Sequence, residues 1–302
     1  MKIGIDIGGS HVASGIILES GKFVAKETRD LVLDENDYDR IEDIIIDIIK
    51  SEIKILLDRY NYEVADISMI GIAAPGSPKD GKLRNLVNLR IKEFDIKSRL
   101  EEIYDTEIKI KNDGKCAGLA EKKQGNLKEY KDCVFLCIGT GVGSSVFLDN
   151  KLLEASNFSG FEIGHMIIKE NGNECNCGNK GCFETYASMK RFKRNTIKEF
   201  DLDKNMQSEE LQEFIRNNMN DSKVNKWVDK YLDNVAIGLV NIINIFEPEA
   251  ICFGGSFSYY DDIFLPILKE KIAKLRFNKE GNTELVVAKL KNDAGIIGAA
   301  LL

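Results

Sequence analysis

The chain lacks the features that mark export, membrane insertion or nucleic-acid binding. It has no run of about 18 apolar residues, the length that a membrane-spanning helix needs. Asp6 interrupts the apolar N-terminus where a signal peptide would need its hydrophobic region. Acidic residues outnumber basic ones, giving a formal net charge of −7 and no basic stripe to neutralise a phosphate backbone. The sequence therefore predicts a cytoplasmic protein with neither a membrane nor a nucleic-acid partner.

Histidine is also scarce, with two in 302 residues, and there are seven cysteines. Four of these lie scattered in apolar surroundings and are expected to be buried reduced thiols: Cys116, Cys133, Cys137 and Cys252. A hydrophobic content of 43% with 30% charged residues is ordinary for a globular protein. The length is sufficient for two domains or one large one.

The other three cysteines gather with one histidine in the most informative part of the chain, between Glu162 and Glu184. The four candidate ligands are His165, Cys175, Cys177 and Cys182. A Cys3His set suits a closed tetrahedral Zn²⁺ site with no position left for water. Free thiols, an iron–sulfur cluster and a disulfide are the alternatives. We interpret the cluster as a structural zinc site that holds the two flanking carboxylates and the imidazole around something else.

Glycine turns follow three of the predicted strands. They are Gly8-Gly9-Ser10, Gly139-Thr140-Gly141 and Gly254-Gly255. Such turns let backbone N–H groups approach a polyphosphate closely, although none is a Walker A loop or a good dinucleotide fingerprint. Asp6, directly before the first turn, is a candidate for Mg²⁺, or a turn residue that satisfies backbone N–H groups. The turns predict a site for nucleotide phosphates.

Strands and helices alternate along the chain, which indicates an α/β fold. Strand–turn–strand units open both halves, with Gly8 in one corresponding to Gly139 in the other. An amphipathic helix is expected over residues 37–57, and a strongly apolar helix over residues 228–246. The polar stretch 192–225 is interpreted as a helical surface insertion.

Asp113 stands where an alternating strand, residues 107–113, gives way to a helix. A carboxylate there is either a helix N-cap or a general base that accepts a proton from a hydroxyl. With phosphate-binding turns and Mg²⁺, the second reading predicts phosphoryl transfer.

The chain resembles the ROK family of sugar kinases and repressors along its whole length. The matching motifs are DIGGS at 6–10, GIAAPG at 71–76, ND at 112–113, GTGVG at 139–143, EIGH at 162–165, CNCGNKGCFE at 175–184, FGGS at 253–256 and AGIIGAA at 294–300. The resemblance implies a two-lobed actin-like ATPase (ribonuclease H-like) fold with duplicated mixed sheets flanked by helices and an active site in the cleft. It implies a small lobe of residues 1–116, completed by about 291–302, and a large lobe of 117–290 with a zinc-binding loop at 165–182.

The resemblance also implies ATP-dependent phosphorylation of a hexose hydroxyl, with glucose C6 as the leading acceptor. Asp113 looks like the catalytic base. Sugar-binding residues carried over by motif are Gly76, Asn112, Asp113, Glu162, His165 and Glu184. Those carried over for the nucleotide are Asp6, Gly8, Gly9, Ser10, Gly139, Thr140, Gly141, Gly254 and Gly255. His165 would bind zinc with one ring nitrogen and face the sugar with the other.

The chain departs from the family pattern at Ser10, at His11 where lysine is usual, and at Gly114-Lys115 after the base. N-acetylmannosamine, N-acetylglucosamine and fructose are alternative substrates. A sugar-responsive repressor would carry an additional N-terminal helix-turn-helix, for which the sequence shows no room. A non-catalytic sugar-sensing regulator would need a lost base or phosphate turn. A homodimer or homotetramer is expected from the family.

Overall fold

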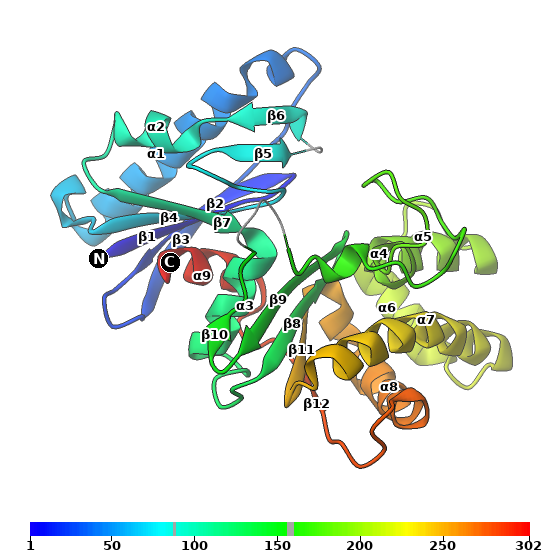
Figure 1. The fold of residues 1–302 in the computed structure, drawn as a ribbon. Coiled ribbons are helices and arrows are strands. Elements are labelled where there is room, and N and C mark those ends of the chain that lie inside the picture. The colour runs from blue at the N-terminus through cyan, green and yellow to red at the C-terminus, as the bar shows by residue number, and fades with distance from the viewer. Residues whose placement is uncertain (87–88, 156–159) are drawn as a thin grey trace. The chain divides into compact units, whose positions relative to one another are not determined.

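The computed structural model describes residues 1–86, 89–155 and 160–302. The chain divides into two compact units, which Figure 1 shows coloured along the sequence. The first comprises Met1–Gly125, Ala155–Gly160 and Asn292–Leu302, and the second comprises Asn126–Glu154 and Phe161–Lys291.

The first unit runs to Gly125, past the boundary expected at residue 116, because helix α3 (Asp113–Gln124) packs against the C-terminal helix α9 (Ala294–Ala300). The two helices touch backbone to backbone. A Cβ on Gly298 would lie only 1.8 Å from the carbonyl oxygen of Cys116. No side chain fits there, so α3 and α9 behave as one packed pair.

The first unit is built on a mixed five-stranded sheet with the order β3-β2-β1-β4-β7. Its strands are β1 (Lys2–Ile7), β2 (His11–Ile17), β3 (Phe23–Asp30), β4 (Met69–Ala74) and β7 (Glu107–Asn112). β1 pairs antiparallel with β2 and parallel with β4. The remaining elements of this unit are α1 (Ile41–Tyr60), α2 (Ile96–Glu101) and a hairpin of β5 (Leu83–Leu86) and β6 (Ile91–Phe94).

Alternation along β1 decides which side chains face which helix. Ile3, Ile5 and Ile7 are fully buried in one core cluster with the apolar face of α1. The intervening positions face α9, where a Cβ on Gly4 would meet the backbone of Ile296. Asp6 lies on this second side, at the C-terminal end of the strand. The sheet thereby places a carboxylate beside the start of α9.

The second unit repeats the same plan, with the sheet order β10-β9-β8-β11-β12. Its strands are β8 (Cys133–Ile138), β9 (Val142–Leu148), β10 (Lys151–Leu152), β11 (Ala250–Gly254) and β12 (Glu284–Val287). β8 pairs antiparallel with β9 and parallel with β11, as β1 does with β2 and β4. The repeat predicted from Gly8 and Gly139 is confirmed, since each glycine turn joins the first two strands of its sheet.

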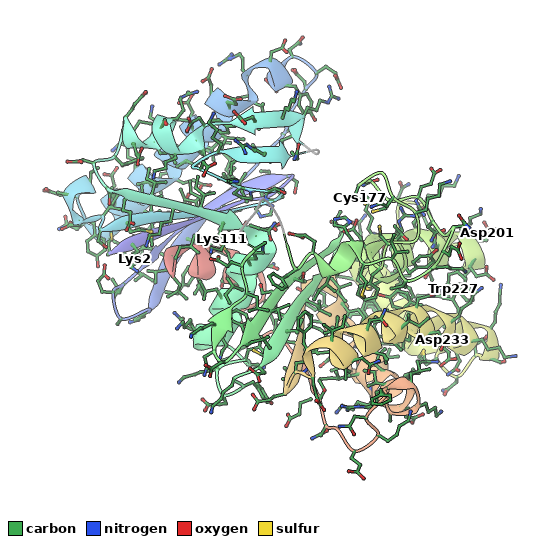
Figure 2. The ribbon with its side chains drawn as sticks, in the orientation of Figure 1. Lys2, Lys111, Cys177, Asp201, Trp227 and Asp233 are labelled. Carbon is green, nitrogen blue, oxygen red and sulfur yellow. The ribbon has the colours of Figure 1, made fainter. Side chains whose placement is uncertain are left out.

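The helices of the second unit are α4 (Glu184–Ala187), α5 (Met189–Phe200), α6 (Ser208–Asn218), α7 (Ser222–Phe246) and α8 (Asp261–Leu275). The stretch 192–225, expected to be a surface insertion, is helical but contributes to the core. Phe192, Leu211 and Ile215 are buried there because they fall on the inner faces of α5 and α6. Trp227, labelled in Figure 2, ties α7 to α5 through a 2.9 Å hydrogen bond from its indole N–H to the Thr196 hydroxyl.

No helix in the described part of the chain combines the length and apolar character needed to cross a bilayer. The four scattered cysteines are free thiols, and Cys116, Cys133 and Cys252 are buried as expected, while Cys137 is partly exposed.

One core position of the first unit carries a carboxyl group. Glu52 of α1 is 1% exposed, accepts a 2.7 Å hydrogen bond from the Ser14 hydroxyl through Oε2, and has no partner for Oε1. Burial raises the pKa of Glu52 from 4.5 to about 7. The fold favours the neutral carboxyl, so this contribution to stability is complete below pH 4.5 and is lost as the pH rises through 7.

Substituting Glu52→Gln should therefore flatten the pH dependence of stability. Between about pH 5 and pH 8 the wild type should lose about 1–3 kcal/mol of unfolding free energy relative to the variant. Urea unfolding at several pH values measures this difference. Parallel curves for the two proteins would show that Glu52 does not titrate differently in the folded state.

Candidate functional site

Asp6 and Asp113 lie close together in the first unit. Burial, with the neighbouring charge of Asp113 as the second cause, raises the pKa of Asp6 from 3.8 to about 7. The carboxylate of Asp6 also occupies the space beside Gly295, where a Cβ would come within 2.3 Å of Oδ2. Two neighbouring carboxylates offer the oxygen ligands that Mg²⁺ prefers. The residues present fit the expected Mg²⁺ chemistry.

Asn112, not Asp113, is the N-cap of α3. Its Oδ1 accepts the backbone N–H of Lys115 at 3.3 Å, and its Nδ2 donates to the carbonyl oxygen of Gly76 at 3.1 Å. Asp113 is the first residue inside the helix, and its Oδ1 accepts the N–H of Gly114 at 2.7 Å. The N-cap alternative for Asp113 is therefore wrong. The amide of Asn112 joins the start of α3 to the turn after β4.

The turn requires a residue without a side chain at position 76, which Gly76 provides. Its φ of +81° lies in the left-handed region, and a Cβ would come within 2.2 Å of the carbonyl oxygen of Arg84. The turn leads into residues 77–95, which include the β5–β6 hairpin. Residues 87 and 88 of that segment lie outside the described part of the chain.

The departures from the family pattern have defined places in the first unit. The imidazole of His11 lies against the first glycine turn, within 2.9 Å of where a Cβ of Gly8 would be. The Ser10 carbonyl accepts the N–H of Leu31 at 2.8 Å, and the Ser10 side chain is exposed. The Nζ of Lys115 donates to the carbonyl of Gly160 at 3.4 Å. Lys115 therefore has a partner and does not simply point into solvent.

The other two glycine turns meet in the second unit. A Cβ on Gly255 would lie 2.6 Å from the carbonyl oxygen of Ile138 and 3.2 Å from the nitrogen of Gly139. The pairing of β11 with β8 causes this approach, because both strands end at the same edge of the sheet. Gly139-Thr140-Gly141 and Gly254-Gly255 thus lie side by side at this edge of the sheet. Gly8-Gly9-Ser10 belongs to the first unit.

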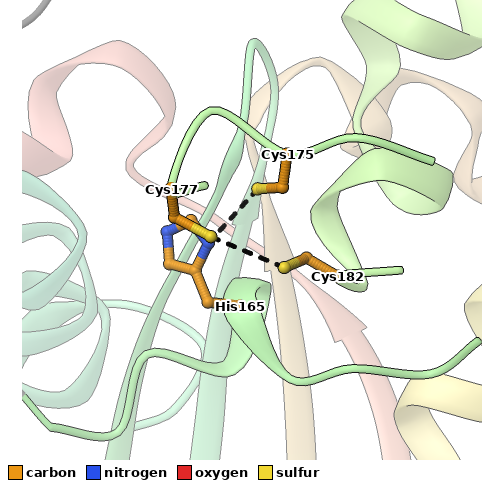
Figure 3. Close-up of side chains that lie close together, drawn as sticks. All are labelled: His165, Cys175, Cys177 and Cys182. Atoms are coloured by element: carbon orange, nitrogen blue, oxygen red, sulfur yellow. Dashed lines mark hydrogen bonds between the residues drawn. The ribbon is translucent and has the colours of Figure 1, made fainter. Parts of the chain in front are cut away.

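The four predicted zinc ligands come together, as Figure 3 shows. All four ligand atoms of His165, Cys175, Cys177 and Cys182 lie within 4.8 Å of one another. Nδ1 of His165 is 3.6 Å from Sγ of Cys175, and Sγ of Cys177 is 3.6 Å from Sγ of Cys182. In a zinc tetrahedron with metal–sulfur bonds of about 2.3 Å, two ligands lie about 3.7 Å apart. The donor set and its spacing fit Zn²⁺.

The three thiols differ in how easily they ionise. The backbone N–H of Asn179 lowers the pKa of Cys177 to about 7, whereas burial raises the pKa of Cys182 to about 12 and raises that of Cys175. Zinc binds thiolates, so its charge would offset the cost of ionising the two buried thiols. Cys177, which is exposed, is the thiol of the three that ionises most readily.

Backbone hydrogen bonds and two small β-bridges also connect parts of the loop. Ile167 pairs with Cys182, and Glu174 pairs with Lys180. The N–H of Phe183 donates to the carbonyl of Met166 at 2.8 Å. Nδ1 of His165 faces the thiol of Cys175, so Nε2 is the ring nitrogen that could contact another group. Glu162 is exposed just before His165.

Glu184 makes a contact that the sequence did not predict. It begins α4 two residues after Cys182, and its Oε2 accepts the backbone N–H of Val142 at 2.9 Å. This contact joins the loop that carries the candidate zinc ligands to the glycine turn between β8 and β9. Val142 belongs to the GTGVG motif, but its contact with Glu184 was not predicted. Sequence reasoning also missed Lys190, whose N–H donates to the carbonyl of Gly139 at 3.2 Å. No local pattern indicates either contact, because the partners are far apart in the chain.

The predicted site residues thus form two sets, each described within its own unit. The first unit holds Asp6, Gly8, Gly9, Ser10, Gly76, Asn112 and Asp113. The second unit holds Gly139, Thr140, Gly141, Glu162, His165, Cys175, Cys177, Cys182, Glu184, Gly254 and Gly255.

Comparison with known proteins gives a consistent picture. A family model described as "ROK family" matches residues 2–302. The xylose repressor of Bacillus subtilis is 30% identical, over 98% of this chain and 75% of that protein. The glucokinase of Thermotoga maritima is 29% identical, over 99% of this chain and 95% of that protein.

Among solved structures, a glucokinase from Streptomyces griseus in complex with glucose and AMPPNP has a TM-score of 0.80. It is 23% identical, and the match covers 99% of this chain and 97% of that one. At this identity the likeness concerns the fold, which is the actin-like ATPase fold with duplicated mixed sheets flanked by helices. The fold class predicted from the sequence is confirmed.

Proposed function

Because the chain belongs to the ROK family, we propose that it is an ATP-dependent sugar kinase that transfers the γ-phosphate of ATP to a hexose hydroxyl. The observation that carries the proposal is the pair of carboxylates, Asp6 and Asp113, held together at the ends of β1 and β7. Phosphoryl transfer needs a base for the hydroxyl proton and a place for the cation that accompanies the phosphates. The similarity to a glucokinase over nearly its full length supports glucose C6 as the leading acceptor.

Asp113 is proposed as the general base. The hydroxyl oxygen of the sugar forms a bond to the γ-phosphorus, the bond from that phosphorus to the bridging oxygen breaks, and ADP leaves. The hydroxyl proton passes to the Asp113 carboxylate. Mg²⁺, when bound, neutralises phosphate charge, and Asp6 would hold it directly or through water. The glycine turns would bind the phosphates through their backbone N–H groups.

Sugar recognition is proposed for Gly76, Asn112, Asp113, Glu162, His165 and Glu184. Zinc, when bound, fixes the imidazole of His165 through Nδ1, so that Nε2 can hydrogen-bond a sugar hydroxyl. Bound zinc would hold these side chains with the positional precision that an in-line attack requires. No chemical step is assigned to it.

A non-catalytic sugar-sensing regulator is the second candidate, because a repressor is about as similar to this chain as a glucokinase is. The two candidates differ in one property, since a regulator binds a sugar without turning it over. The retained Asp113, together with the glycine turns, favours the kinase.

A coupled assay of ADP release should show turnover with MgATP and at least one hexose. The panel is glucose, N-acetylmannosamine, N-acetylglucosamine and fructose. Xylose is the matched control, because it lacks the C6 hydroxymethyl group and offers no acceptor at that carbon. Sugar binding seen by calorimetry, without turnover of any hexose, would refute the kinase and support the regulator.

A further inference from the structure

The carboxylate of Glu184 is part of the glycine turn between β8 and β9. Its Oε2 accepts the N–H of Val142 at 2.9 Å, and it fills the position that a side chain on Gly141 would occupy, 2.4 Å from an ideal Cβ. A hydrogen bond to an ionised group is stronger than one between neutral groups. The contact therefore constrains the end of the turn where β9 begins.

Two backbone hydrogen bonds constrain the rest of the turn. Gly139 donates to the carbonyl of Gly141 at 3.0 Å and accepts from the N–H of Lys190 at 3.2 Å. Within the described part of the chain, the N–H groups of Thr140 and Gly141 make no hydrogen bond. They are the donors that remain for a phosphate, and Glu184 helps hold them in place.

The other end of Glu184 is anchored in the zinc-binding loop. The hydroxyl of Thr185 donates to the carbonyl of Cys182 at 2.8 Å, and the N–H of Phe183 donates to Met166. One helix later, the guanidinium of Arg191 donates to the carbonyl of Glu174 at 2.8 Å. Residues 182–191 thus contact the loop at one side and the glycine turn at the other.

From this arrangement we propose that Glu184 is a positioning residue for the nucleotide, in addition to the sugar contact assigned to it above. Its carboxylate orders the Gly139–Gly141 turn before any sugar arrives. One side chain would then set the affinities for both substrates. This inference rests on the proposed function, because it assumes that the turn binds nucleotide phosphates.

The test is the affinity for Mg·AMPPNP, measured by calorimetry without sugar. Glu184→Ala should weaken binding about 10-fold or more, since a hydrogen bond to a charged group commonly contributes that factor. Glu184→Gln keeps a carbonyl oxygen for the N–H of Val142 and should stay within about 3-fold of the wild type. In the coupled assay the glutamine variant should nevertheless raise the sugar KM, because its single acceptor cannot serve both partners.

Glu199→Ala is the matched control. It removes an exposed carboxylate of the same unit that pairs with Lys223 and has no proposed part in substrate binding, so nucleotide affinity should be unchanged. Zinc content and thermal melting establish that each variant is folded, and Glu184→Asp replaces the alanine variant if that one does not fold. Aspartate is one methylene shorter, so it should weaken nucleotide binding as alanine does.

The outcomes separate this inference from the proposed function. Wild-type protein that binds no nucleotide would refute both. Nucleotide binding that is equally tight in the wild type, Glu184→Ala and Glu184→Asp would refute the positioning role alone. A loss in Glu184→Ala that glutamine restores would support it.

Discussion

Replacing Asp113 by asparagine is expected to lower kcat for sugar phosphorylation by about 10²–10⁴-fold, the usual contribution of a general base. Asparagine has nearly the same shape and keeps an oxygen to accept the N–H of Gly114, so the start of α3 should survive. It cannot take up the proton of the attacking hydroxyl. The loss should therefore fall on kcat, while the sugar KM changes little. Steady-state kinetics in the coupled assay separate the two parameters.

Asp95→Asn is the matched control for this substitution. Asp95 also stands at the start of a helix in the first unit, where it caps α2 and accepts the N–H of Ser98 at 3.1 Å. It has no proposed part in catalysis, and asparagine caps helices about as well as aspartate. Its kcat should match the wild type. An Asp113→Asn enzyme that retains the full rate would show that another group accepts the proton.

Local sequence patterns predicted much of this molecule because the features concerned are local. The duplicated strand–turn–strand units follow from alternation and a glycine turn within about 17 residues. The grouping of the four candidate zinc ligands could likewise be predicted from their spacing, since three of them lie within residues 175–182. In both cases a short stretch of chain largely fixes its own geometry.

Features that depend on tertiary packing were not predictable in the same way. The hydrogen bond between Glu184 and Val142 joins residues 42 apart in the chain, and no sequence pattern encodes it. The approach of Gly255 to Ile138 depends on the parallel pairing of β11 with β8. The stretch 192–225 looked polar because each of its helices buries only a narrow face. The sequence left open whether Asp113 is the N-cap of α3, since Asn112 and Asp113 are both good caps, and the structure gives that position to Asn112.

Loss of zinc is expected to have the second large effect, on sugar affinity. Cys177→Ser should abolish the binding of about one zinc ion per chain, because a serine hydroxyl does not ionise to replace a thiolate. Bound zinc would connect His165 to Cys182, which lies two residues before the short helix α4 that begins at Glu184. Loss of the metal would remove this connection. We expect the sugar KM to rise about 10-fold or more, the factor that a lost hydrogen bond to a charged group commonly costs. Elemental analysis and sugar titration measure the two effects.

Cys133→Ser provides the matched control, because it makes the same chemical change at a buried thiol of the same unit. Sγ of Cys133 lies 3.8 Å from the carbonyl of Tyr130, a contact that a hydroxyl can also make. This variant should keep both its zinc and its sugar affinity. Treating the wild type with a chelator should reproduce the Cys177→Ser phenotype, and added Zn²⁺ should reverse it in the wild type only. If Cys177→Ser kept its metal and its sugar KM, the ordering role of the cluster would be excluded. Loss of the metal at an unchanged sugar KM would instead show that the backbone bridges between residues 167 and 182 are enough to hold the loop.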